Sequence, residues 1–267
     1  MTGPAQPSVT PVLLYHSVTK KRLNDPWQVS AADFRLDMET LAATGRIAMT
    51  ATTYAAGLRG ELELPPNPVL VTFDDGFADF ADEALPVLSE LGLPASLFVT
   101  TGWLNTRGML SSESLRDLAS TGSVEIGAHS ETHPHLDLLD HRTAWGEISG
   151  SRARLEDLTG TPVGAFAFPH GSHRRRTLAL VERAGYGTAH AVKDALSHAG
   201  DNPYAVARFT VHAGTSRREV AEVIAGRGAP TAWAGERLRT AAFRAVRYAR
   251  LRRTGMRSVT HPVGGAA

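Results

Sequence analysis

The sequence predicts a parallel α/β fold, either an open sheet or a barrel, built as one sizeable domain. Apolar runs rich in β-branched and aromatic residues alternate with segments that carry apolar residues at helical spacing, which is typical of strands joined by helical crossovers. Several apolar runs end in Asp or His, at the strand ends where such folds keep their chemistry. The 267 residues, 42% of them hydrophobic, suffice for one large core.

The predicted elements alternate between strand and helix over most of the chain. They are, in order, a strand over 11–16, a helix over 30–41, a strand over 69–73, a helix over 79–91, a strand over 95–100, a helix over 112–120, a strand over 124–128, a helix over 143–158, a strand over 164–168, a helix over 175–184, strands over 187–192 and 204–211, and a helix over 216–225. Strands are predicted at continuous apolar runs, and helices where apolar residues recur every three or four positions.

Local signals set several of the helix ends. Ser30 is a suitable N-cap for the first helix, with Asp33 at the capping-box position. Pro86 lies inside the second helix and weakens that prediction. Gly160 and Gly185 directly follow two later helices, where glycine commonly stops a helix.

The composition excludes several classes of chemistry. There is no cysteine, so disulfides, thiolate nucleophiles and Cys-ligated zinc are absent, and a metal would be held by His, Asp or Glu. The first residues lack a basic segment followed by an apolar one, and no apolar run approaches the roughly 20 residues of a membrane span. We therefore expect a cytoplasmic protein.

Two strand ends carry the side chains best suited to metal binding. One apolar strand runs directly into Asp74 and Asp75, adjacent carboxylates that repel each other and are costly to bury unless a cation compensates them. Another strand is followed by His129 and His133, which could reach one ion from a compact loop. The two histidines alone would equally suit surface or capping roles. Together with the aspartates they predict a metal site.

These motifs resemble those of a known family, the metal-dependent polysaccharide deacetylases of carbohydrate esterase family 4, also called the chitooligosaccharide-deacetylase homology domain. Residues 72–76 (Thr-Phe-Asp-Asp-Gly) are similar to its first motif and residues 129–133 (His-Ser-Glu-Thr-His) to its second. Residues 166–171 (Phe-Ala-Phe-Pro-His-Gly) resemble the third motif of the poly-N-acetylglucosamine deacetylase branch. The resemblance covers about residues 10–226 and implies a distorted (β/α) barrel with fewer than eight strands.

The resemblance implies roles for the two metal motifs. Asp75, His129 and His133 would hold one divalent ion, usually Zn²⁺, with Co²⁺, Ni²⁺ or Mn²⁺ as alternatives. Asp74 would stay off the ion and act as general base, taking a proton from a metal-activated water as that water attacks an acetamide carbonyl.

Further residues are expected around the substrate. The resemblance implies that a backbone N–H of the third motif, here that of His170 after Pro169, binds the oxyanion. It places the general acid on a His at the end of the last strand, which points to His212, with His170 as the rival. His16, in a Tyr-His opening common to the branch, either lines the site or caps its strand.

The sequence departs from the commoner family pattern in two places. The third motif lacks the Arg that orients the catalytic Asp, and the fourth motif's Asp-Trp pair is absent. Arg208 is a candidate for the first role, although a surface salt bridge is the simpler expectation for it, so nothing obvious orients Asp74. Trp103 follows a strand end and suits either stacking on a sugar ring or closing the core.

We expect three parts, a leader over residues 1–9, a deacetylase-like catalytic domain over 10–229 and a basic tail over 230–267. Eight arginines and no acidic residue fall between positions 237 and 257. A helix drawn over 236–253 is amphipathic, which favours an anionic membrane surface at the inner face or an acidic partner. The alternative is a solvated helix or a disordered end, and no patch of interleaved basic and aromatic residues supports nucleic-acid binding.

The leading hypothesis is therefore a metal-dependent hydrolase that removes N-acetyl groups from an amino sugar or from an N-acetylated oligosaccharide or polysaccharide. An amide or imide hydrolase acting on a small non-sugar metabolite is the alternative, since no export signal is seen and the fourth motif is missing. A catalytically inactive carbohydrate-binding homologue is a third hypothesis. Acetate release from acetylated sugars and small amides separates the three.

Overall fold

A computed structural model describes residues 9–21, 23–233 and 246. Its elements are β1 (Val9–Thr10), β2 (Val12–Tyr15), β3 (Ser17–Thr19), β4 (Gln28–Ser30), α1 (Ala31–Ala43), β5 (Ile47–Ala48), α2 (Ala51–Leu58), β6 (Pro68–Phe73), the π-helix η1 (Phe80–Ala84), α3 (Leu85–Glu90), β7 (Ala95–Val99), the 3₁₀ helix η2 (Thr101–Trp103), α4 (Ser112–Ser120), β8 (Val124–Ala128), the 3₁₀ helix η3 (Leu136–Leu138), α5 (His141–Thr159), β9 (Ala165–Ala167), the 3₁₀ helix η4 (Pro169–Gly171), α6 (Arg175–Arg183), β10 (Thr188–His190), β11 (Ser197–His198), β12 (Phe209–Thr210) and α7 (Arg217–Ile224).

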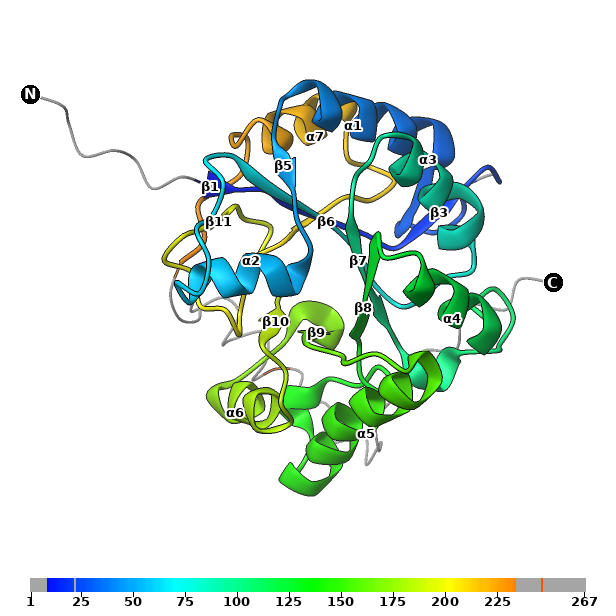
Figure 1. The fold of residues 1–267 in the computed structure, drawn as a ribbon, viewed down its shortest axis with the longest axis vertical. Coiled ribbons are helices and arrows are strands. Elements are labelled where there is room, and N and C mark those ends of the chain that lie inside the picture. Colours follow the sequence, from blue (N-terminus) through cyan, green and yellow to red (C-terminus); the bar gives the residue numbers. More distant parts are fainter. Residues whose placement is uncertain (1–8, 22, 234–245, 247–267) are drawn as a thin grey trace, which may run out of the picture.

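Eight strands form one curled sheet in the shape of a half-barrel, with helices around it (Figure 1), and seven of these strands lie on one continuous path. Their order is β10-β9-β8-β7-β6-β2-β12, and every neighbouring pair is parallel. The short β5 pairs with the start of β6 outside this path. Helices α1 and α7 pack together on one side of the half-barrel, and α5 contacts both α4 and α6 on another. The predicted distorted barrel is confirmed, with seven strands on its continuous path.

The capping signals in the sequence locate the helix ends correctly. The Ser30 hydroxyl accepts a hydrogen bond from the Asp33 N–H at the start of α1, and Ser216 caps α7 in the same way. Gly160 takes the left-handed conformation at the end of α5, with φ of 68°. The long helices of the prediction therefore begin and end within a few residues of their observed bounds.

Several segments differ from the prediction, and the short strands β1, β3, β4, β5 and β11 have no counterpart in it. The helix expected over 79–91 is split into η1 and α3, with Pro86 in the first turn of α3, because Pro has no N–H to continue an α-helical ladder. The strand expected over 204–211 shrinks to β12, since Val206 instead forms an isolated bridge with His190. Helix α2 has no counterpart in the prediction.

The predicted leader and tail lie almost entirely outside the described residues. Only Val9 of the leader and residues 230–233 and 246 of the tail are described. The amphipathic helix expected over 236–253 and its membrane or acidic partner therefore stay predictions. Among the described residues, no helix has both the length and the apolar character needed to cross a membrane.

The register of the sheet brings the carboxyl ends of the central strands to one edge. Tyr15 of β2 pairs with Phe73 of β6, which pairs with Leu97 of β7, and all three side chains are fully buried. Val99 at the end of β7 pairs with Ala128 at the end of β8. The polar residues that follow β2, β6 and β8 therefore lie along the same edge of the sheet.

Asp79 makes the stability of this fold depend on pH. It is half-buried beside β3, where its Oδ2 accepts the Ser17 hydroxyl and its Oδ1 is buried with no hydrogen bond from the described residues. Burial raises the pKa of Asp79 to about 6, so the folded chain holds a proton that the unfolded chain releases. Its contribution to the free energy of unfolding is full below about pH 4 and is lost as the pH rises through about 6.

Asp79→Asn should therefore flatten the fall in unfolding free energy between about pH 4 and pH 7 by ~1–3 kcal/mol, since one pKa unit corresponds to about 1.4 kcal/mol. Urea unfolding of the variant and wild type at several pH values measures this. The exposed Asp117 of α4, changed to Asn, is the matched control and should keep the wild-type slope. Identical pH profiles for Asp79→Asn and the wild type would contradict the assignment.

Candidate active site

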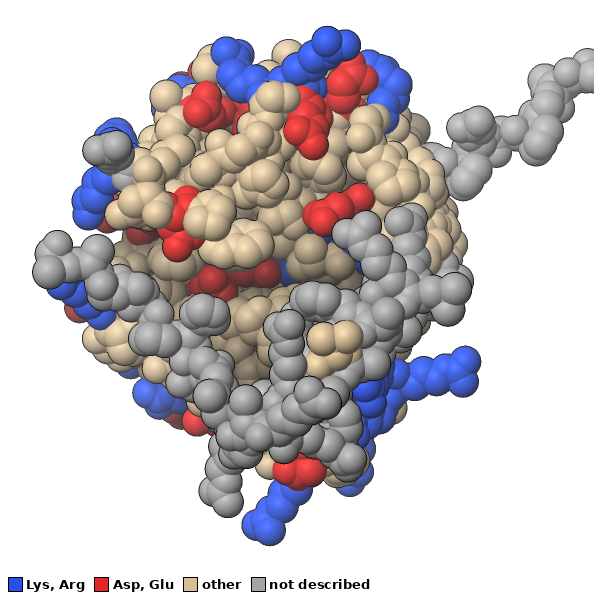
Figure 2. Space-filling model, turned by 180° about the vertical axis from the view of Figure 1, so that it is seen from behind, with Lys and Arg blue, Asp and Glu red and all other residues tan. Residues whose placement is uncertain are grey.

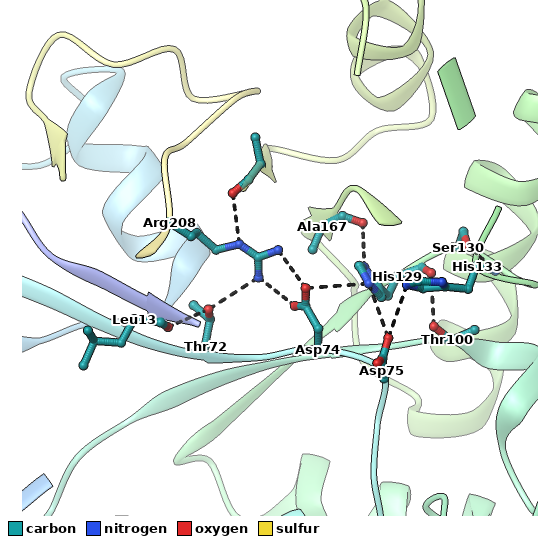
Figure 3. Close-up of polar contacts among 11 residues, drawn as sticks. Leu13, Thr72, Asp74, Asp75, Thr100, His129, Ser130, His133, Ala167 and Arg208 are labelled. Carbon is teal, nitrogen blue, oxygen red and sulfur yellow. Dashed lines mark hydrogen bonds and ion pairs between the residues drawn. The ribbon is translucent and has the colours of Figure 1, made fainter. Parts of the chain in front are cut away.

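Polar side chains gather at the carboxyl edge of the sheet, directly after the strands that position them (Figure 3). The Asp74 N–H donates to the carbonyl oxygen of Tyr15 over 3.0 Å, which continues the pairing of β2 and β6 by one residue. The His129 N–H donates to the carbonyl oxygen of Val99 over 2.9 Å and does the same for β7 and β8. The backbone of Asp74 and His129 is thus held by hydrogen bonds that continue the sheet, and this fixes where both side chains begin.

Asp75, His129 and His133 bring three donor atoms together. One ligand atom from each residue lies within 4.8 Å of the others, and this is the sole such group of three found in the described part of the chain. Oδ1 of Asp75 lies 3.5 Å from Nε2 of His129 and 3.4 Å from Nε2 of His133. Three protein donors with room for a further ligand are the pattern of a catalytic zinc site.

The protonation of these groups fits a divalent cation. Nδ1 of His129 lies 2.9 Å from the carbonyl oxygen of Ala167, a contact that places the proton on Nδ1 and leaves the Nε2 lone pair facing Asp75. Oδ1 of Asp75 is buried and receives no hydrogen bond from the described residues. Burial, followed by the charge of Asp74, raises the pKa of Asp75, whereas burial lowers the pKa of His129 and His133. Neutral imidazoles and an uncompensated carboxyl are what a metal ion needs.

Backbone strain is concentrated at this edge. Asp75, Ser130, His133 and His170 all have φ between 58° and 74°, in the left-handed region that side chains other than glycine rarely adopt. Ser130 accepts the His133 N–H over 2.9 Å, which turns the loop back toward Asp75. The second motif is therefore a tight turn rather than a helix, as expected from the proline that follows His133.

Neighbouring elements hold the loop that carries His133. The Gly102 N–H donates to the carbonyl oxygen of Glu131 over 2.8 Å, and a Cβ at Gly102 would meet that oxygen at 2.5 Å, so only glycine fits. From α5, the Glu147 carboxylate accepts the backbone N–H groups of Glu131 (2.9 Å) and Thr132 (2.8 Å) and the Thr132 hydroxyl (2.6 Å). Glu147 thus acts on His133 through the loop.

Glu147→Ala is expected to weaken zinc binding by about 10- to 100-fold, because the loop loses three hydrogen bonds that orient a metal-binding imidazole. Titration of the chelated protein with zinc against a competing indicator measures the change. The zinc affinity of Glu147→Gln should fall between those of the wild type and Glu147→Ala, since the amide has one accepting oxygen instead of two. Asp157, exposed on the same helix, provides the control in Asp157→Ala, which should bind zinc like the wild type. Unchanged affinity in Glu147→Ala would show that the loop is fixed without it.

Arg208 pairs with Asp74 in a fully buried ion pair. Nη1 lies 2.6 Å from Oδ1 and Nη2 lies 2.8 Å from Oδ2, and neither side chain is more than 3% exposed. The Nε–H donates to the carbonyl oxygen of Ala191 over 3.2 Å, and the guanidinium lies over the Phe98 ring at 5.5 Å. The expectation of a surface salt bridge is wrong, because curling of the sheet brings the segment before β12 over the end of β6.

The electrostatics of the pair keep Asp74 ionised. Burial alone would raise the pKa of Asp74, but the charge of Arg208, helped by His129, outweighs it and holds the pKa well below its usual range. Both carboxylate oxygens are fixed by the guanidinium, so the carboxylate has one orientation. Arg208, which the sequence offered as a candidate beside the simpler expectation of a surface salt bridge, thus holds the Asp74 carboxylate in place.

The structure brings His16 to this edge. His16 follows β2 and is half-buried, with its Nδ1 buried and without a hydrogen bond from the described residues. Burial lowers the pKa of His16 to about 4, against an opposing effect of Asp74, so the ring is neutral. His16 follows β2, the strand that pairs with β6, and the charges of Asp74 and Arg208 both act on its ring.

His212 lies apart from this cluster. It is exposed on the loop after β12, where its Nδ1 accepts the Gly214 N–H over 3.1 Å and its backbone N–H donates to the Thr215 hydroxyl. It lines a small pocket with Asp33 and Asp37 of α1. Within the described part of the chain, no hydrogen bond or ion pair joins it to Asp74 or to the three donors.

The third motif and Trp103 border the donor set on its other side. The rings of His170 and His133 lie 4.5 Å apart, and those of Trp103 and His133 lie 5.0 Å apart. His135 stacks on His170 at 3.7 Å. Pro169 is buried at the start of η4, and His170, which follows it, is exposed. Trp103 is half-buried, and the role of the His170 N–H toward an oxyanion stays a prediction.

The face turned away from the view of Figure 1 is hollowed near its middle, with acidic side chains at the floor of the hollow and several Lys and Arg side chains toward the periphery (Figure 2). Two residues near the site, Glu147 and Trp27, were not singled out from the sequence. The ring of Trp27 lies against that of His16, with 4.9 Å between the ring centroids. Glu147 could not be singled out from the sequence, because the groups that it binds lie in the second motif, at Glu131 and Thr132. The position of Trp27 in a loop just after the Tyr-His opening is a signal that could have found it.

The curled parallel sheet, with polar residues gathered at its carboxyl edge, is a distorted (β/α) barrel. Residues 61–189 match the family described as Polysaccharide deacetylase. It is 25% identical over 211 residues to YxkH of Bacillus subtilis (strain 168), an alignment that spans 79% of this chain and 74% of YxkH. The resemblance drawn from the sequence motifs is confirmed.

Two solved structures illustrate the shared fold. The deacetylase PplD of Streptococcus pyogenes, solved in complex with acetate, superposes with a TM-score of 0.75 at 18% identity, covering 82% of this chain and 99% of PplD. IcaB of Ammonifex degensii superposes with a TM-score of 0.71 at 25% identity, covering 82% of this chain and 98% of IcaB. The fold therefore extends well beyond the segment that matches the family.

Proposed function

We propose that the protein is a metal-dependent deacetylase that hydrolyses the N-acetyl group of an amino sugar in an oligosaccharide or polysaccharide. The observation that carries the proposal is the set of Asp75, His129 and His133 directly beside Asp74, within the segment that matches the polysaccharide deacetylase family. A divalent ion bound there, for which zinc suits the donors best and Co²⁺, Ni²⁺ or Mn²⁺ are alternatives, would supply Lewis-acid chemistry to water and to the acetamide carbonyl.

Asp74 would take the proton of the attacking water. Its Oδ2 lies 3.6 Å from Nε2 of His129, so the carboxylate borders the donor set without belonging to it. Because Arg208 keeps Asp74 ionised and fixes both oxygens, the base is oriented before the substrate arrives.

We propose His16, rather than His212, as the group that delivers a proton to the leaving amine. His16 lies one strand away from Asp74, because β2 pairs with β6, and its ring is buried at Nδ1 and neutral. A neutral imidazole in this position can take up the proton released on the Asp74 side and pass it to the amine nitrogen, so that protons balance within one turnover. His212 is exposed and turned into its own loop.

His16→Ala is expected to lower kcat by about 10²-fold or more with zinc content unchanged, and His212→Ala should retain activity within about threefold, since general acid catalysis contributes about 10²–10⁴-fold. Acetate release measures kcat, and atomic absorption measures zinc. The reverse ranking of the two variants would return the role to His212.

The proposed function is tested by acetate release from N-acetylated glucosamine oligosaccharides and from small acetamides, using protein that has been chelated and then given zinc. We expect release from the oligosaccharides that is lost on chelation and restored by zinc. Turnover of small amides alone would favour a metabolite amidase. Glycan binding without hydrolysis of any acetylated substrate would favour an inactive homologue. Activity that survives complete chelation would overturn the metal dependence.

A further inference from the structure

An exposed tryptophan stands beside the candidate site on the side away from Trp103. Trp27 is 49% exposed, although it is among the largest apolar side chains in the chain. One part of its indole lies against His16, with 4.9 Å between the ring centroids and 45° between the planes. Among the described residues, the other exposed large hydrophobic side chains are Ile47 and Val246, so Trp27 is the exposed aromatic one. An exposed indole beside the candidate site leaves an aromatic face open to a ligand.

The loop that presents Trp27 is anchored at several points. The Trp27 N–H donates to Oδ1 of Asp25 over 2.8 Å, and its carbonyl oxygen accepts the Ser17 N–H over 3.4 Å. The next residue back, Pro26, accepts the Ala213 N–H over 2.9 Å, which ties the loop to the segment after β12. An exposed aromatic ring on a fixed backbone is preorganised for contact, because little conformational freedom remains to be lost on binding.

The sheet topology puts the two tryptophans on opposite sides of the reacting groups. His16, which Trp27 contacts, follows β2, whereas His133, which Trp103 contacts, follows β8. Strands β6 and β7 lie between them in the sheet, and β6 carries Asp74 and Asp75. Three strand spacings correspond to roughly 14 Å. A single sugar ring that reacts between them cannot cover both indoles.

We propose that Trp27 forms a sugar-binding position that stacks on a pyranose ring neighbouring the residue to be deacetylated, on the side opposite Trp103. Pyranose rings have apolar faces edged by hydroxyl groups, which suits an exposed indole with polar neighbours. Asp25 and the exposed Asn24 border Trp27 and supply such polar groups. The preferred substrate is then an N-acetylated glycan of several units that passes across the site, rather than a monosaccharide. This inference rests on the proposed function.

The test compares Trp27→Ala with the wild type on N-acetylglucosamine and on its β-1,4- and β-1,6-linked oligomers up to the hexamer, with zinc-loaded protein. Trp27→Ala should raise KM for the better hexamer by about tenfold, and the loss of kcat/KM on the hexamer should exceed any loss on the monomer by about that factor. Trp27→Phe should restore most of the hexamer affinity, since an aromatic face remains. Ile47→Ala removes an equally exposed apolar side chain from β5 and should change nothing.

The outcomes separate this inference from the proposed function. A wild-type enzyme that is active on the hexamer, together with a Trp27→Ala variant of the same KM, overturns the sugar position and leaves the function intact. An equal loss on monomer and hexamer also overturns it, because Trp27 would then act through His16. If the wild type hydrolyses no sugar, the proposed function fails. Calorimetric titration with the hexamer then tests whether Trp27 contributes to sugar binding. Equal or absent binding in wild type and Trp27→Ala then refutes the position.

Discussion

Replacing Asp74 with Asn is expected to lower kcat by about 10²–10⁴-fold, the usual contribution of a general base. The Asn side chain keeps the shape of the carboxylate but cannot take a proton from water. Zinc content should stay at the wild-type level, because Asp74 lies outside the set of Asp75, His129 and His133. Acetate release and atomic absorption on the same preparation measure both quantities. Asp75→Asn, by contrast, should lose zinc as well as activity, since it removes one of three donors.

The variant must be shown to fold, because Asn leaves the buried charge of Arg208 without its partner. Thermal unfolding, with assays kept well below the midpoint, controls for this. The exposed Asp82, changed to Asn, removes a carboxylate of the same kind and should retain full activity. Full activity in a folded, zinc-loaded Asp74→Asn enzyme would rule out Asp74 as the base. Loss of zinc together with activity would instead place Asp74 among the ligands.

The donor set could be predicted from the sequence because Asp75 and His129 lie just after strands, and His133 belongs to the same short loop as His129. Asp75 follows β6 and His129 follows β8, and the sheet hydrogen bonds continue into both turns. In parallel strands the carboxyl ends share one edge, so adjacency in the sequence to a strand end becomes adjacency in space. Arg208 could not be predicted in the same way, since its contact with Asp74 depends on how far the sheet curls. Nothing local to residue 208 distinguishes a buried guanidinium from an exposed one.

The errors in the fold have similar causes. The apolar stretch over 204–211 has the composition of a strand, but Val206 forms an isolated bridge to His190 of β10, and only β12 joins β2. Helix α2 is short, and its start depends on the Glu125 carboxylate of β8, which accepts the N–H groups of Ala51 and Thr52. A cap supplied from a distant strand leaves no local signal.

Replacing Arg208 with Met is expected to lower the free energy of unfolding by about 3–5 kcal/mol, because Asp74 is left as a buried charge without a partner. The same change should raise the pKa of Asp74, which burial pushes upward and Arg208 pushes downward. Asp74 must be ionised to act as base, so the acid limb of the kcat/KM profile should move to higher pH. Arg208→Lys should show a smaller shift, since an ammonium cannot bind both oxygens as the guanidinium does.

Urea unfolding and pH profiles of Arg208→Met, Asp74→Asn and the double variant distinguish this coupling from a general loss of packing. If the pair is coupled, the double variant should be destabilised by at least about 1 kcal/mol less than the sum of the single variants. Arg154→Met, a change at an exposed arginine of α5, should leave both stability and the acid limb unchanged. Additive losses with an unmoved acid limb would mean that Arg208 only fills space. Coupling together with a shifted acid limb would mean that the general base depends on an ion pair between residues 134 positions apart in the chain.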